Sequence, residues 1–150
     1  MLLAEALKER ADLQTLVARL HERLDANARV QEDEKPTEDP RELLTKLDEA
    51  LARLEYLMVH INKTNAVSKV GDETLMALLA KRDCLKQKMG ILRSFLNEAS
   101  DLTSRMCRDE IKVLPTVAVA EQQNRLDKLS QDLRLLEVRI QQSNWNTELL

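Results

Sequence analysis

The hydrophobic positions of this chain recur with helical spacing over most of its length. From residue 47 to residue 65 they lie four, three, four, three and four residues apart, a spacing that forms one narrow line along a helix. Because an uncovered apolar line is unstable in water, this line predicts a long helix that packs against another helix. The line is Leu47, Leu51, Leu54, Met58, Ile61 and Asn65.

Three further segments show a similar pattern, so we expect helices over about residues 2–29, 40–66, 72–100 and 117–145. The apolar line of the third segment is interrupted by one charged residue, Arg82. The first segment has the stripe Leu13, Leu16, Val17, Leu20 and Leu24, the third has Leu78, Arg82, Leu85, Met89, Leu92, Leu96 and Ala99, and the fourth has Val119, Leu126, Leu129, Leu133, Leu136 and Ile140.

Helix-breaking residues separate these segments. Residues 30–40 form an acidic linker with two prolines, five acids and one lysine, which fits a solvated connector or an acidic docking loop. Asp39 and Pro40 suit the N-cap and the first position of the second helix. Asp72 is the expected cap of the third helix, and residues 101–116 are expected to be an irregular connector.

The pattern predicts an all-α fold in one helical domain spanning residues 1–150. Similar helix lengths favour long antiparallel helices, which form either a four-helix bundle or a coiled-coil assembly. Since the apolar lines are narrower than the faces of a usual single bundle, we expect a homo-oligomer.

Composition supports long helices and narrows the function classes. The chain has two glycines, 2% aromatic residues and 33% charged residues. A net charge of −3 without a basic stripe argues against nucleic acid as a partner. The longest apolar run, Leu75 to Ala80, is too short for stable membrane insertion, and Glu5 interrupts any signal-peptide core. We therefore expect a cytoplasmic protein in which Cys84 and Cys107 stay reduced.

Up-down-up-down connectivity would bring polar residues from all four helices to one end of the assembly. One interpretation is that Asn65 and Arg82 fix helix register, with Arg82 paired to Glu5, Glu9 or the terminal carboxylate region. The other is a site for a small anion or metabolite, with Arg82 as the planar donor. The candidate residues are Glu5, Glu9, Asn62, Asn65, Arg82, Asp83, Asn144 and Trp145.

The sequence offers no pattern typical of catalysis or of a bound cofactor. It contains no Glu-x-x-His motif and no glycine-rich phosphate loop, and neither cysteine has a histidine close to it in sequence. We therefore predict no catalytic residues, no metal ligands and no cofactor. Trp145, the only tryptophan, is expected to close the end of the bundle, with an exposed contact for another chain as the alternative.

Several stretches of the chain resemble the septicolysin-like family of small bacterial proteins. They are residues 4–14, 61–66, 79–85, 111–117 and 139–149, of which the last, RIQQSNWNTEL, is the most specific. The resemblance implies a bacterial source and an all-helical fold, and the name of the family suggests a haemolysin. It assigns no catalytic residue.

These observations favour a non-enzymatic homo-oligomeric protein that acts by self-assembly or by binding a protein partner. A small-ligand-binding or hydrolytic protein with its site at the polar end is the first alternative. Membrane lysis is the second alternative, although narrow apolar stripes and mixed charges on the helices do not favour it.

Overall fold

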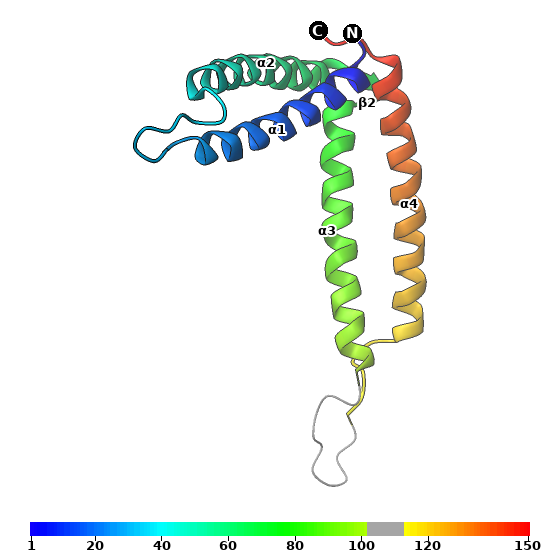
Figure 1. Ribbon diagram of the computed structural model, residues 1–150. Helices are drawn as coiled ribbons and strands as arrows, with labels where there is room; N and C mark the ends of the chain where they lie inside the picture. The colour runs from blue at the N-terminus through cyan, green and yellow to red at the C-terminus, as the bar shows by residue number, and fades with distance from the viewer. Residues whose placement is uncertain (102–112) are drawn as a thin grey trace. The chain divides into compact units, whose positions relative to one another are not determined.

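The protein is mostly α-helical, as the sequence predicts. The computed structural model describes residues 1–101 and 113–150, which contain four helices and one two-stranded sheet (Figure 1). The order is α1 (Leu3–Ala26), α2 (Pro40–Val67), β1 (Lys69–Val70), β2 (Glu73–Thr74), α3 (Leu75–Ser100) and α4 (Val119–Asn146). The all-α class is thus confirmed, apart from this small sheet. Cys107 and most of the irregular connector lie outside the described residues.

Local chemistry explains where α2 and α3 begin. The Asp39 carboxylate accepts a hydrogen bond from the Arg41 amide at 2.9 Å, so Asp39 caps α2 as predicted. The predicted cap Asp72 is wrong for α3. Gly71 adopts a φ of +69° and turns the chain into the β1–β2 hairpin, so the backbone remains extended until Thr74, which caps α3.

The chain divides into two compact units, which we call unit 1 and unit 2. Unit 1 consists of Met1–Lys69 together with Ser143–Leu150, and unit 2 consists of Val70–Gln142. In each unit two long helices run antiparallel, α1 with α2 and α3 with α4 (Figure 1).

Unit 1 buries a line of residues with regular spacing of three and four on both of its helices. On α2 this line differs from the predicted one, because Leu51 and Met58 are exposed while Ala50 and Leu57 are buried. The apolar surface of α2 is therefore wider than one line. Leu47, Leu54 and Ile61 are buried or half-buried as predicted, and residues one position earlier take the place of the other predicted members. The buried line consists of Leu43, Leu47, Ala50, Leu54, Leu57, Ile61 and Thr64 on α2, of Leu3, Ala6, Arg10, Leu13, Val17, Leu20 and Leu24 on α1, and of Asn27 directly after α1.

Unit 2 packs along the lines that the sequence predicts. Its core contains Met89 and Leu96 from α3 and Leu126 from α4, with half-buried leucines of both helices packed against them. On one flank of the pair, the Lys86 ammonium lies 2.7 Å from the Glu137 carboxylate. The predicted lines of α3 and α4 therefore correspond to the observed contact between these helices.

Candidate functional site

The candidate polar residues fall into the two compact units. Glu5, Glu9, Asn62, Asn65, Asn144 and Trp145 belong to unit 1, whereas Arg82 and Asp83 belong to unit 2. Arg82 pairs with its sequence neighbour, since its Nε donates to the Asp83 carboxylate at 2.8 Å. Arg82 and the two glutamates each have a partner within their own unit, and the pairing of Arg82 with Glu5 or Glu9 stays a prediction.

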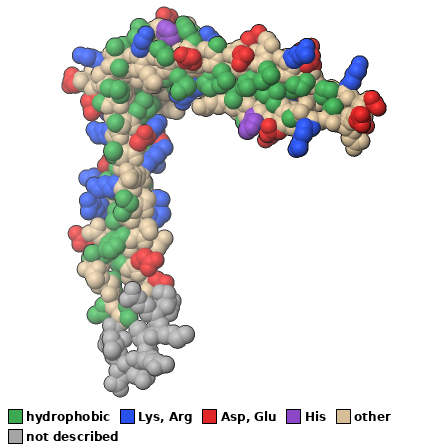
Figure 2. Space-filling view, turned by 90° about the vertical axis from the view of Figure 1, so that its left-hand side faces the viewer, with side chains coloured by type: hydrophobic (Ala, Val, Ile, Leu, Met, Phe, Trp, Pro, Cys, Tyr) green, Lys and Arg blue, Asp and Glu red, His purple; other side chains and the backbone are tan. Residues whose placement is uncertain are grey.

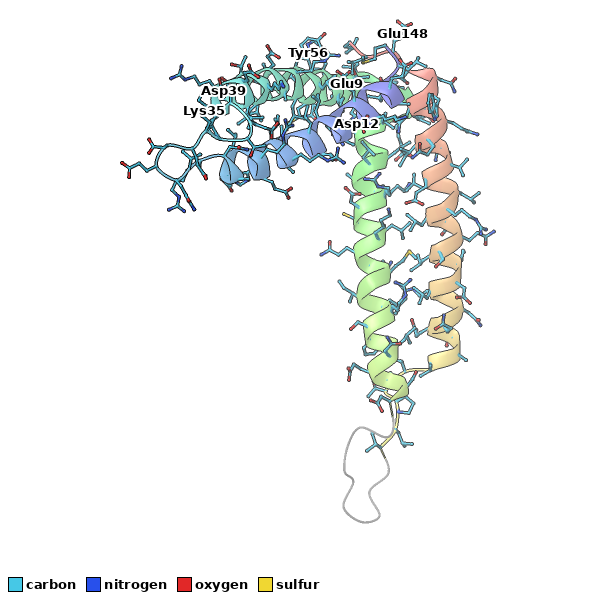
Figure 3. All side chains as sticks on the ribbon, in the orientation of Figure 1. Glu9, Asp12, Lys35, Asp39, Tyr56 and Glu148 are labelled. Atoms are coloured by element: carbon cyan, nitrogen blue, oxygen red, sulfur yellow. The ribbon has the colours of Figure 1, made fainter. Side chains whose placement is uncertain are left out.

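The two glutamates of α1 have different partners within unit 1. Glu5 accepts a hydrogen bond from the Leu2 amide at 2.7 Å and so satisfies a free N–H at the start of α1. Glu9 accepts two hydrogen bonds from Arg53 of α2, at 2.6 and 2.8 Å. These bonds hold the pKa of the Glu9 carboxyl below its usual value. Figure 3 shows Glu9 on α1 and Tyr56, whose ring lies beneath the Arg53 guanidinium, on α2.

A second arginine–glutamate pair lies on the same flank of unit 1. Arg23 is fourteen residues after Glu9, so both side chains leave the same side of α1. The Arg23 Nε donates to the Glu38 carboxylate at 2.9 Å, which lowers the pKa of the Glu38 carboxyl. The Glu38 amide in turn donates to the Asn27 side chain at 3.0 Å. This end of the acidic linker is therefore held against α1, and two ion pairs, Glu9–Arg53 and Arg23–Glu38, lie along this flank.

Residues Thr147–Leu150 close one end of unit 1. Their backbone pairs with the start of α1, since the Leu3 amide donates to the Thr147 carbonyl at 2.8 Å and the Leu149 amide donates to the Met1 carbonyl at 2.9 Å. The fully buried Thr64 hydroxyl accepts from the Leu150 amide at 3.0 Å and donates to the His60 carbonyl at 2.8 Å. The tail thus has a structural role that its sequence pattern did not reveal.

The other candidate residues of unit 1 differ in exposure. Asn144 is buried and Asn65 is half-buried, whereas Asn62 is exposed. Trp145 is 59% exposed, so the expectation that it closes a bundle end is wrong. Its position agrees with the alternative of an exposed contact residue.

Sequence reasoning missed the polar members of the buried line in unit 1, which are Arg10, Thr64 and Asn27. Arg10 continues the spacing of Leu3, Ala6 and Leu13, and its Nε is buried without a hydrogen-bond partner. The signal was present in that spacing, but the stripe of the first segment was assigned only from Leu13 onward.

The opposite flank of unit 1 is apolar and has no covering element among the described residues. Leu44, Leu51 and Met58 each follow a buried residue by one position, about 100° around α2, whereas Arg53 lies on the other side of the buried line. Leu51 is 43% exposed and Met58 is 47% exposed. We call Leu44, Leu51 and Met58 the open flank of unit 1. Figure 2 shows a band of hydrophobic side chains along the α1–α2 unit.

Unit 2 also has an open flank, on the side away from the Lys86–Glu137 pair. It holds two shallow grooves, of about 410 Å³ and about 300 Å³. Exposed apolar side chains stand along both, among them Ile91, which is 64% exposed. We define the open flank of unit 2 by the groove residues Lys81, Lys88, Ile91, Phe95, Arg125, Asp132, Leu135 and Arg139.

The described residues offer no metal site and no membrane span. Within residues 1–101 and 113–150, no group of three His, Cys, Asp or Glu side chains is placed to hold a metal ion. In the same part of the chain, no helix combines the length and the apolar character needed to cross a bilayer.

Comparison with known proteins places the chain in a family. Residues 10–149 match a group described as a family of unknown function, DUF6847. The chain belongs to this family. A search of curated proteins finds no match.

One solved structure is similar to this member of the DUF6847 family over its full length. It is described as the crystal structure of a functionally unknown conserved protein from Corynebacterium diphtheriae. The identity is 36%, the TM-score is 0.93, and the match covers 100% of this chain and 99% of the other. Neither finding names an activity, and the resemblance to septicolysin-like proteins stays a prediction.

Proposed function

We propose that this protein acts without catalysing a reaction, by assembling with copies of itself or with a protein partner through its helical units. The observation that carries the proposal is the open flank of each unit. Covering the apolar stripe of a helix stabilises that helix. Within each unit the two helices cover the apolar surface between them, and the open flank stays exposed. The predicted bundle or coiled-coil arrangement would then be completed by contacts between chains.

The size of the exposed apolar surface supports this proposal. Full burial of a leucine or methionine side chain stabilises by roughly 1.5–3 kcal/mol. Leu44, Leu51 and Met58 are each about half exposed, so covering them would contribute about 1 kcal/mol per residue. Regular exposed apolar lines of this kind are typical of interaction surfaces.

The small-ligand alternative has less support. Its planar donor Arg82 already pairs with Asp83, its neighbour in sequence. Glu5 and Glu9 already accept hydrogen bonds from their own unit. Membrane lysis, the other alternative, would require release of a trapped dye from liposomes on addition of the protein.

Light scattering on the purified chain over a wide concentration range tests the self-assembly proposal. We expect a mass that is a multiple of 17.2 kDa, and that falls toward the chain mass on dilution. A mass of 17.2 kDa at every concentration would remove self-assembly and leave only a different protein as partner.

A further inference from the structure

The open flanks of the two units carry opposite charge with the same repeat. On α2, Asp48 and Glu55 each lie four residues after an apolar member of the open flank of unit 1, and both acids are exposed. On α3, Lys81 and Lys88 line the grooves of the open flank of unit 2. Each pair is separated by seven residues, or about 10.5 Å along a helix.

We propose that the open flank of unit 1 in one copy packs against the open flank of unit 2 in a second copy. This interface rests on the proposed function and specifies its self-assembly branch. Leu44, Leu51 and Met58 would enter the grooves beside Ile91 and Leu135. Asp48 and Glu55 would then face Lys81 and Lys88.

Charge favours this pairing over contact between two identical flanks. The grooves of unit 2 carry four basic residues and one acid, so two such flanks would repel each other. Two unit 1 flanks would bring Asp48 and Glu55 of both copies together, which is also unfavourable. Only the mixed contact covers both apolar surfaces and matches the charges at the same interval.

A contact between different surfaces either closes on itself or continues into a filament. We propose the closed form, in which two copies exchange this contact reciprocally and each contributes both of its flanks. The expected assembly therefore has twice the chain mass of 17.2 kDa.

Charge reversal tests the pairing directly. One variant carries Asp48→Lys and Glu55→Lys, and the other carries Lys81→Glu and Lys88→Glu. In either variant alone both contacts of the dimer become repulsive, so we expect the dimer dissociation constant to rise by about tenfold or more. Mixing the two variants places opposite charges at both contacts again. The mixture should regain the dimer mass as a heterodimer.

A matched control uses the same helix with the same spacing and the same change of charge. Glu42→Lys with Glu49→Lys alters the side of α2 that carries Tyr56, and it should leave the dimer mass unchanged. Circular dichroism confirms that all variants keep their helix content.

The outcomes separate this interface from the broader proposal. Loss of the dimer in both variants and recovery on mixing support the interface. A wild-type oligomer that neither reversal weakens, or that mixing does not restore, overturns the interface but leaves self-assembly standing. A wild-type mass of 17.2 kDa at every concentration overturns the interface and self-assembly together, and leaves a different protein as the partner.

Discussion

The contact between the Thr64 hydroxyl and the Leu150 amide provides a sharp test of how unit 1 is closed. Thr64→Val keeps the shape of the side chain and removes one buried hydroxyl. It breaks the hydrogen bonds to the Leu150 amide and to the His60 carbonyl. A net loss of about 0.5–1.5 kcal/mol per hydrogen bond gives roughly 1–3 kcal/mol in total. In a chain of this size that corresponds to a Tm lower by about 2–4 °C per kcal/mol.

Thr45→Val supplies the control for this measurement. The Thr45 hydroxyl also donates to the carbonyl four residues earlier, at 3.0 Å, but this residue is exposed and contacts no tail. Its replacement should cost less than about 0.5 kcal/mol.

Two readouts locate the effect of Thr64→Val. Thermal unfolding followed by circular dichroism gives the loss of stability, and fluorescence of Trp145 reports on the segment that carries the tail. The reasoning would be refuted if Thr64→Val and Thr45→Val lowered Tm equally, because the buried tail contact would then contribute nothing.

Three further predictions concern the helices of unit 1, each measured by urea unfolding. Leu57→Ala should lower the free energy of unfolding by about 2–5 kcal/mol, because Leu57 is fully buried. Leu51→Ala should lower it far less in the monomer, because Leu51 is exposed. Equal losses would mean that Leu51, as the sequence predicts, belongs to the buried line of α2. Arg10→Met should raise the free energy of unfolding by about 1 kcal/mol, because it removes a buried Nε that has no hydrogen-bond partner. A lower free energy of unfolding would instead show that Arg10 stabilises the fold. The lowered pKa of Glu9 means that its pairing with Arg53 stabilises the fold above its usual pKa of 4.5 and is lost as the pH falls below it. Wild-type stability should therefore fall more steeply with acid than that of Glu9→Gln, and identical slopes would contradict this.

The sequence predicted the secondary structure well because helical periodicity is a local signal. The buried lines of α3 and α4 were also predicted correctly, since only one apolar line with three–four spacing exists on each. On α2 two such lines lie side by side, one through Leu57 and one through Met58. Both lines share Leu47, Leu54 and Ile61, so the prediction is right at these positions, but periodicity alone cannot tell whether Leu57 or Met58 faces α1.

The polar site was harder to predict because it depended on the connection between helices. The assumption of one bundle placed Arg82 beside Glu9, whereas Arg53 is the residue that pairs with Glu9. The N-cap of α3 also lies two residues later than predicted, at Thr74 instead of Asp72, and no strong local pattern marks Thr74 as the cap. The role of Thr147–Leu150 could not be read from the sequence, because it consists of backbone hydrogen bonds to a segment nearly 150 residues away.

The pairing of Leu3 with Thr147 also affects the order of events during synthesis. Unit 2 lies within the chain between the two parts of unit 1, so α1 and α2 leave the ribosome first and Ser143–Leu150 follows the rest of α4. The α1–α2 hairpin can therefore form early, but the end of unit 1 is closed only after Ser143–Leu150 has been made. A nascent chain that stops within α4 would lack the backbone pairing with the start of α1, and the Thr64 hydroxyl would lose the Leu150 amide as its partner.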